Sequence, residues 1–233
     1  MLIFIDLETT GLEKADKICS IALVDEKETS YELINEGKKI PSEASSIHHL
    51  TNEMIKDKAS FKNSDAFKYL QEHNKEENSL VAHNIQFDLN MLSEAGFFWK
   101  GDVIDTLKVT KHLIPECEFF SLQFLRYELK LYRGEEELQK KYGIKDALIA
   151  HNALGDALVC SLLFKYIQEM VSEEKMKELT FKDVLLEKFG FGKYKGRYIE
   201  EICLNDNSYA MWLLNAADID DDTRYSINYY LQG

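Results

Sequence analysis

The first eight residues place two acids at the end of an apolar strand. Met1 to Ile5 is an uninterrupted apolar run, and Asp6 and Glu8 follow it with one residue between them. Side chains at i and i+2 of a β-strand project to the same side, so both carboxylates point toward one site. Two converging carboxylates favour a hard cation between them. The same spacing also arises by chance in solvated turns, so its meaning depends on later segments.

Two later segments carry further acids at helix starts. A short apolar run at 80–82 leads to Asn84 and Asp88, which lie four residues apart on a predicted helix and therefore share a face. His151 precedes Asp156 by five residues, and a second predicted helix continues from there. Within one helix, five residues would rotate through about 500° and leave those two side chains roughly 140° apart. Their convergence therefore requires His151 to lie in the loop before the helix.

Together these segments resemble the three ordered motifs of the DEDDh (DnaQ-like) 3'-to-5' exonuclease superfamily, over roughly residues 1–170. The matching motifs are Asp6-Leu7-Glu8-Thr9-Thr10-Gly11, Asn84-Ile85-Gln86-Phe87-Asp88, and His151 with Asp156. A sister group has tyrosine one residue after the histidine position, where this chain has Asn152, so the histidine form is indicated. Asp105-Thr106-Leu107 and Ser121-Leu122 resemble two further helix starts of the family. No Pro or Gly lies between Lys145 and Ala150, so the loop before His151 is implied by the resemblance alone.

The resemblance implies a cofactor and a division of roles. Four carboxylates and no thiolate suit two divalent cations, Mg²⁺ or Mn²⁺, which would serve phosphodiester hydrolysis. By the family pattern, Asp6 bridges both ions, Glu8 and Asp156 complete one site, and Asp88 helps to hold the other. His151 is the expected general base, because an imidazole can accept a proton near neutral pH.

The resemblance also implies contacts with the terminal nucleotide. Two members of this set have equally good structural interpretations, Glu43 as a loop acid and His48 as a surface imidazole, and Phe87 could simply pack in the core. His49 stands where the family usually has glycine, so the backbone there could differ. The expected substrate-binding residues are Leu7, Thr9, Leu12, Glu43, His48, Asn84 and Phe87.

The last fifty residues form a separate pattern, and we place the boundary between residues 174 and 175. Residues 188–197 contain four basic residues, three glycines and no acid, and residues 189–199 predict a small hairpin that turns at Lys195-Gly196. The segment resembles the small C-terminal module of exodeoxyribonuclease X-like enzymes. Interleaved aromatic and basic residues favour single-strand binding, with a solvated basic hairpin as the alternative. The candidate nucleic-acid contacts are Lys193, Tyr194, Lys195, Arg197 and Tyr198.

Composition bounds the remaining choices. A chain of 233 residues with 45% hydrophobic content can bury a substantial core. No apolar stretch is long enough to span a membrane and a strand begins at residue 2, so we expect no membrane association and a cytoplasmic location. Four scattered cysteines argue against a zinc site. A net charge of −13 argues against binding of nucleic acid by a broad basic surface.

The order of apolar segments predicts an α/β fold. Expected strands lie at 2–8, 18–24, 28–35, 80–83 and 102–105, with helices between and after the last three. The resemblance sharpens this to a ribonuclease H-like mixed five-stranded sheet flanked by helices. The expected function is a metal-dependent exonuclease acting on DNA with a free 3' end and releasing nucleoside 5'-monophosphates. An RNA-trimming exonuclease and a non-catalytic nucleic-acid-binding or adaptor subunit are the alternatives, and no polymerase or repair partner is specified.

Overall fold

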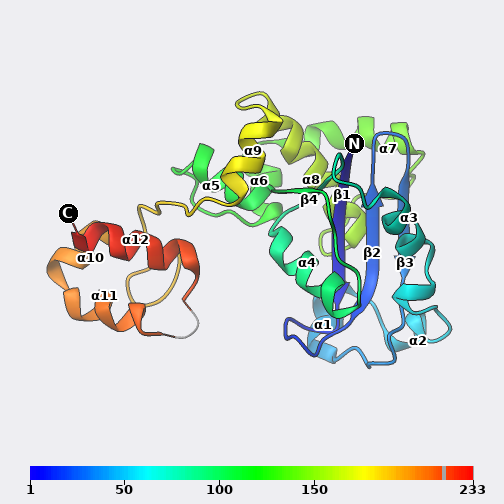
Figure 1. Ribbon diagram of the computed structural model, residues 1–233, viewed down its shortest axis with the longest axis horizontal. Helices are drawn as coiled ribbons and strands as arrows, with labels where there is room; N and C mark the ends of the chain where they lie inside the picture. The colour runs from blue at the N-terminus through cyan, green and yellow to red at the C-terminus, as the bar shows by residue number, and fades with distance from the viewer. Residues whose placement is uncertain (217–218, 233) are drawn as a thin grey trace.

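A five-stranded mixed sheet forms the centre of the first domain in the computed structural model, which describes residues 1–216 and 219–232. The strands run in the order β3-β2-β1-β4-β5 (Figure 1). β1 is antiparallel to β2, and β2 is antiparallel to β3, whereas β1, β4 and β5 are parallel. The expected sheet is therefore confirmed. Its strands are β1 (Leu2–Thr9), β2 (Ile18–Val24), β3 (Thr29–Leu33), β4 (Ser79–Ala82) and β5 (Asp102–Asp105).

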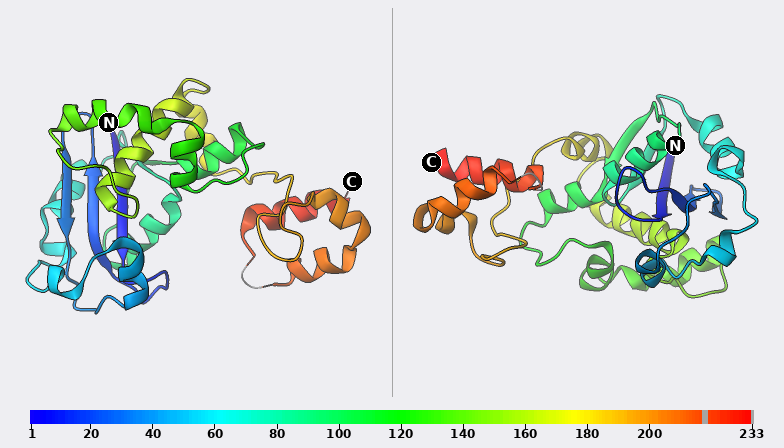
Figure 2. Two further views of the ribbon diagram at one scale, coloured as in Figure 1. Left: turned by 180° about the vertical axis from the view of Figure 1, so that it is seen from behind. Right: turned by 90° about the horizontal axis from the view of Figure 1, so that it is seen from below.

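Alternation along β1 separates two hydrophobic cores. Ile3, Ile5 and Leu7 face the core that includes residues of α3 and α4, and Phe4 faces the core that includes residues of α5, α6 and α8. Helix α8 packs directly on β1 and β2, on the side seen in the left view of Figure 2. Even-numbered residues of β1 therefore face α8. The helices before α8 are α1 (Ser42–His48), α2 (Asn52–Ile55), α3 (Asp65–His73), α4 (Ile85–Glu94), α5 (Thr106–Leu113), α6 (Leu122–Glu128) and α7 (Glu135–Tyr142), with 3₁₀ turns η1 (Phe61–Asn63) and η2 (Leu131–Gly134).

The expected domain boundary falls inside a helix that belongs to the first domain by its contacts. Helix α8 (Ala153–Gln168) is followed by α9 (Glu173–Thr180), which packs against β5 and α5. The Asp105 backbone N–H donates to Thr180 Oγ1 (2.9 Å), which ties the end of α9 to the sheet. We therefore propose that the first domain continues through α9 and that the second begins near residue 182.

The C-terminal module is a small helical unit with its own apolar centre. It contains α10 (Ile199–Asn205), α11 (Asn207–Leu214) and α12 (Asp221–Gln232), and an extended segment connects it to α9 (Figure 1). Phe189, Ile199, Leu213 and Ile227 are among its buried residues. The predicted hairpin at 189–199 is wrong in part, because its chain reversal forms only one bridge, Lys188 to Tyr198, and no paired strands. Glycines at 190, 192 and 196 weaken strand formation there.

Candidate active site

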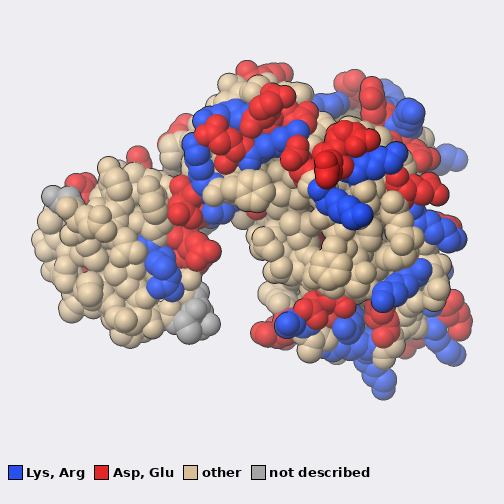
Figure 3. Space-filling view, in the orientation of Figure 1, with Lys and Arg blue, Asp and Glu red and all other residues tan. Residues whose placement is uncertain are grey.

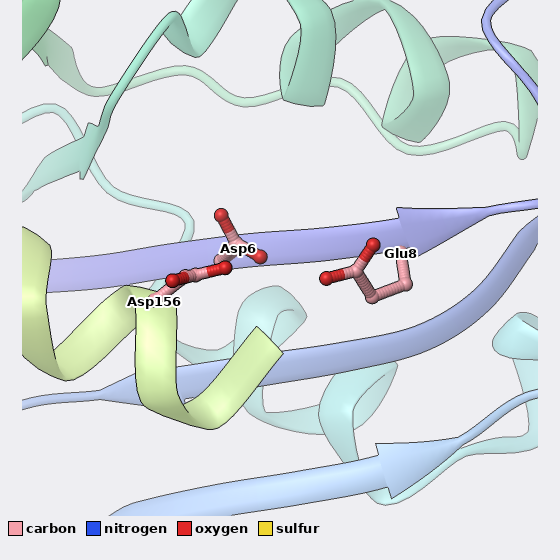
Figure 4. Close-up of side chains that lie close together, drawn as sticks. All are labelled: Asp6, Glu8 and Asp156. Atoms are coloured by element: carbon pink, nitrogen blue, oxygen red, sulfur yellow. The ribbon is translucent and has the colours of Figure 1, made fainter. Parts of the chain in front are cut away.

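Three carboxylates from two elements converge on the side of the sheet that α8 covers. Asp6 and Glu8 occupy even positions of β1, and Asp156 lies in the first turn of α8. One carboxylate oxygen from each residue lies within 4.8 Å of the other two (Figure 4). A register shift in the pairing of β1 with β2 occurs just after Glu8, where the strand leaves the regular ladder. The three acids, distant in sequence, thus form one cluster because α8 packs on β1.

The electrostatics of this cluster favour a bound cation. Burial raises the pKa of Asp6 well above its usual range, and repulsion from Asp88, Asp156 and Glu8 adds to the rise. Burial and then repulsion from Asp156 raise the pKa of Glu8 to about 7. All donors are carboxylate oxygens, which hard divalent ions such as Mg²⁺ and Mn²⁺ prefer. The residues present therefore fit the expected metal chemistry.

Asp88 reaches the same region from the opposite layer. It lies in the first turn of α4, is only 4% exposed, and interacts electrostatically with Asp6. Burial raises the pKa of Asp88, against backbone N–H groups of Asp88 and Leu7 that lower it. The Leu7 side chain itself packs in the core.

Asn84 does not share a helical face with Asp88, so that prediction is wrong. Helix α4 begins at Ile85, and Asn84 precedes it with φ 72°, in the left-handed region. Asparagine tolerates this conformation better than most residues. The backbone N–H of Asn84 donates to Asp105 Oδ1 (3.0 Å), and its exposed side chain is directed by the turn rather than by the helix.

His151 lies in the turn before α8, as convergence with Asp156 required. Its φ is 55°, its side chain is exposed, and its backbone N–H donates to Asp156 Oδ2 (2.9 Å). Gly155 permits this turn, because a Cβ at that position would lie 2.5 Å from the backbone oxygen of Ile149. Sequence reasoning missed Gly155, although a glycine directly before the acid of a helix first turn is a visible signal.

The expected substrate-binding residues fall into two groups. Leu12 is 84% exposed, and with Phe87 it lines a hollow of about 340 Å³ beside α4. Glu43 is exposed in the first turn of α1. Thr9 is buried, and its hydroxyl donates to the Gly11 carbonyl (2.6 Å). Leu12, Phe87 and Glu43 are therefore accessible, whereas Thr9 is committed to the turn after β1.

His48 is an internal residue and not a surface imidazole. It is 5% exposed, its Nδ1 accepts the N–H of Leu50 (3.0 Å), and its Nε2 lies 3.8 Å from Cys19 Sγ. Burial lowers its pKa, so the neutral ring is favoured. His49 adopts φ 62°, the left-handed region that a glycine enters without strain, so this position keeps a glycine-like backbone although it carries a side chain.

A family model described as exonuclease, RNase_T, matches residues 3–164, which include the strand, the acids and the histidine described above. The chain belongs to this exonuclease family. It is an enzyme of the DnaQ-like exonuclease type, and the three clustered acids lie within the matched region.

Curated relatives of this exonuclease include two kinds of protein. Exodeoxyribonuclease 10 of Escherichia coli K12 is 28% identical over 239 residues, covering 100% of this chain and 99% of that protein. The DNA polymerase III subunit epsilon of Treponema pallidum is 30% identical over 167 residues, covering 68% of this chain and 72% of that protein. The first match includes the C-terminal module, whereas the second is limited to about two thirds of the exonuclease.

Solved structures give the same fold. The structure of exonuclease X in complex with 5' overhanging duplex DNA has 27% identity and a TM-score of 0.61, covering 77% of this exonuclease and 99% of that chain. The E. coli ExoI–ssDNA complex has 19% identity and a TM-score of 0.53, covering 74% of this exonuclease and 41% of that chain, and shows the fold alone. Among the described residues of the exonuclease, no helix is long and apolar enough to cross a membrane.

The basic residues of the module are partly neutralised by neighbouring acids. Lys193 Nζ lies 3.1 Å from Asp206 Oδ2, and Arg197 pairs with Glu201. Lys195 lies over the Phe119 ring of the first domain, 5.4 Å from its centroid. The hydroxyl of Tyr194 donates to Asp206 (2.7 Å), and Lys188 lies over the half-exposed Tyr198 ring (4.8 Å). Each of these side chains therefore already has a protein partner.

Proposed function

We propose that the chain is a divalent-metal-dependent 3'-to-5' exonuclease that hydrolyses DNA from a free 3' end and releases nucleoside 5'-monophosphates. The observation that carries the proposal is the convergence of Asp6, Glu8 and Asp156, whose oxygens lie within 4.8 Å of one another beside the exposed His151. The name exodeoxyribonuclease of the full-length E. coli relative supports DNA as the substrate. The structure of exonuclease X in complex with 5' overhanging duplex DNA also supports DNA as the substrate.

The four acids would act as ligands of two metal ions. Two divalent ions, when bound, would stabilise negative charge on both the attacking and the leaving oxygen of the phosphodiester. Asp6, which interacts with all three other acids, is the residue suited to bind both ions. Glu8 and Asp156 would complete one site, and Asp88, from the opposite layer, would help to hold the second.

His151 would act as the general base. Its side chain is free in solvent, whereas its backbone is fixed by the hydrogen bond from its N–H to Asp156 Oδ2. The ring would take a proton from the attacking water while the Asp156 carboxylate holds the turn in place. The leaving 3' oxygen of the penultimate nucleotide would then receive a proton from solvent.

The accessible residues near this centre would orient the terminal nucleotide. Leu12 and Phe87 would contact its base across the hollow beside α4, and the exposed Asn84 would add a polar contact. The buried Thr9 and Leu7 would contribute through their backbone, and Glu43 through its exposed carboxylate. His48 is left out of this set because it is buried, with its two ring nitrogens beside Cys19 and the N–H of Leu50.

The decisive experiment is digestion of matched DNA and RNA oligonucleotides labelled at either end. The full chain should shorten 5'-labelled DNA progressively from its 3' end with Mg²⁺ or Mn²⁺ and should be inactive with a chelator. Asp6→Asn is the control for a contaminating nuclease, and it should lose activity more completely than Asp88→Asn. Activity that survives thorough chelation, or degradation from the 5' end, would overturn the proposal. Faster digestion of RNA would replace DNA by RNA as the substrate.

The C-terminal module would add a second contact with the DNA strand. Figure 3 shows few charged side chains on the visible face of the module. Binding would combine aromatic stacking by Tyr194 or Tyr198 with a few phosphate contacts. If Lys193, Lys195 and Arg197 contact phosphates of a single strand, binding should have a log-log salt slope of about −2. The triple alanine variant should lose that slope while it still hydrolyses a mononucleotide ester. An unchanged slope would exclude these contacts, and the exposed Lys140→Ala is the matched control.

A further inference from the structure

A series of side-chain hydrogen bonds leads away from Asp156 to α6 and α7, and no motif of the sequence indicated it. The side-chain amide of Gln123, on α6, donates through Nε2 to Asp156 Oδ1 (2.5 Å). One turn further along α6, Arg126 Nη1 donates to Gln123 Oε1 (3.1 Å). Arg126 also forms a bidentate pair with Glu135 at the start of α7, through Nε (2.6 Å) and Nη2 (2.7 Å).

The direction of these hydrogen bonds fixes the Gln123 amide. A guanidinium has only donors, so Arg126 can face only the oxygen end of the amide. The NH₂ end must then point away from Arg126, toward Asp156. Without Arg126 the amide could turn over and present its oxygen to the carboxylate, which would repel it. Glu135 in turn holds the guanidinium in one plane, because bidentate pairing adds geometric specificity.

The same guanidinium also holds the segment that leads to His151. Arg126 Nη2 donates to the backbone oxygen of Leu148 (3.0 Å), three residues before His151. Arg126 is 6% exposed and the Glu135 side chain is 14% exposed, so solvent does little to screen this arrangement. One buried cation therefore connects the Asp156 side chain, through Gln123, with the turn that carries the candidate base.

The orientation of Asp156 follows from two protein donors. Gln123 donates to Oδ1 and the His151 N–H donates to Oδ2, one donor for each oxygen. Each oxygen keeps a further acceptor position, and one of them lies within 4.8 Å of oxygens of Asp6 and Glu8. A carboxylate held in this way needs no reorganisation when it accepts a cation.

We infer that Gln123 and Arg126 are positioning residues of the active site, which preorder the Asp156 carboxylate and the His151 turn for metal binding and hydrolysis. This inference rests on the proposed function. Neither residue contacts the reacting atoms, so each would act through Asp156 or the Leu148–His151 turn. Partners of metal-ligating groups typically contribute 10–100-fold to metal affinity or activity. We expect a loss of that size in Mn²⁺ affinity and in kcat, with the KM for DNA nearly unchanged.

The first test uses Gln123→Met in the full chain, since methionine keeps the length of the side chain but cannot donate a hydrogen bond to Asp156. Mn²⁺ binding is measured by calorimetry without DNA, and kcat and KM are measured on a 5'-labelled oligonucleotide. About 10-fold weaker Mn²⁺ binding together with a lower kcat supports positioning. Mn²⁺ affinity and kcat within twofold of the unmodified protein would overturn the inference. Lys140→Met, which breaks an exposed pair with Glu136 on α7, is the matched control and should change neither quantity.

A second test separates positioning from a purely structural role of the arginine. Arg126→Lys keeps the charge but lacks the planar fork, so it should still fold while the Gln123 amide loses its fixed orientation. Its Mn²⁺ affinity should fall as in Gln123→Met, and the double variant should lose no more than the larger single loss, because both act along one path. A lower Tm with unchanged Mn²⁺ affinity, or fully additive losses, would overturn the inference. Absence of metal-dependent hydrolysis in the unmodified protein would instead contradict the proposed function.

Discussion

Three acids share one small buried volume because β1 and α8 face each other, and this burial opposes their ionisation. Asp6, Glu8 and Asp156 all have raised pKa values, with burial as the largest cause in each case. A carboxyl whose folded-state pKa is raised binds a proton more tightly in the folded state than in the unfolded state. Without metal, the free energy of unfolding must therefore decrease as the pH rises from the pKa of the unfolded state to that of the folded state.

The first prediction concerns the pH dependence of the metal-free protein. Glu8 should titrate near its ordinary value when unfolded and at about 7 when folded, so its penalty is absent below about pH 4.5 and complete above about pH 7. Between pH 5.5 and 8 we expect Tm in chelator to fall by at least about 4 °C, since 1 kcal/mol corresponds to about 2–4 °C at this size. Glu8→Gln should reduce the fall, and saturating Mg²⁺ should raise Tm most at high pH. A Tm in chelator that rises over this interval would contradict the raised pKa.

The second prediction concerns the exposed imidazole. His151 contributes a backbone N–H, not its ring, to the hydrogen bond with Asp156, so His151→Ala should keep that hydrogen bond and remove the imidazole. We expect kcat to fall by about 100-fold or more, with Mn²⁺ affinity and single-strand binding nearly unchanged. Steady-state kinetics and calorimetry on the same preparation provide the measurement. An equal loss of metal binding would make His151 a structural residue.

At the level of elements, the turn before α8 depends on a residue without a side chain. Ile149 crosses so close to Gly155 that its backbone oxygen would lie 2.5 Å from an added Cβ. The turn and the helix are therefore in backbone contact, and the position of His151 is set by that contact as much as by the residues of the turn itself. Backbone atoms cannot give way as the end of a flexible side chain can.

The third prediction follows from this close approach. Gly155→Ala should displace the 148–151 turn and lower kcat at least about 10-fold, because small misplacements of catalytic groups are costly. Gly190→Ala is the matched control, since a Cβ there meets nothing within 4 Å. Both variants should have similar far-UV circular dichroism, and only Gly155→Ala should lose hydrolysis. Full activity of Gly155→Ala would show that the turn can shift without consequence.

The elements differ in how far the sequence could predict them. The five strands were predictable because apolar runs and alternation are strong local signals, and Asp105 and Ser121 cap α5 and α6 as their motifs indicated. The α4 start at Asn84 was not, because a left-handed residue before a helix leaves no periodic trace. The burial of His48 and the contact between Gln123 and Asp156 depend on packing between distant segments, which no local pattern encodes.

At the level of the whole molecule, one buried acid attaches the module to the first domain. Asp222, at the start of α12, is 4% exposed and accepts hydrogen bonds from Lys108 (2.9 Å), Lys111 (3.1 Å) and the Val184 N–H (3.0 Å). Burial alone would raise its pKa, but these three donors outweigh it and the pKa lies below the ordinary value. The attachment should therefore be complete at neutral pH and should weaken as the pH falls toward that lowered pKa.

The fourth prediction tests this attachment. Asp222→Asn should leave the two ammonium groups without an anionic partner and cost about 1–3 kcal/mol, less than a fully buried pair because both lysines reach solvent. The segment at 181–188 should then be cut faster by protease, while hydrolysis of a short single strand stays intact. Asp221→Asn, at the exposed neighbouring position, is the control. Equal cleavage rates in the two variants would show that other contacts hold the module.

The position of β1 in the sheet also sets when the protein can become active during its own synthesis. β1 is made first, yet it is the central strand, and its parallel partner β4 begins only at Ser79. The acid cluster needs Asp156, which is synthesised about 150 residues after Asp6. At about 5–20 residues per second, translation of this stretch takes roughly 8–30 s. Local pairing of β2 with β3 can form early, but the acid cluster closes a much longer loop. The growing chain therefore carries no hydrolytic centre until most of the first domain has left the ribosome.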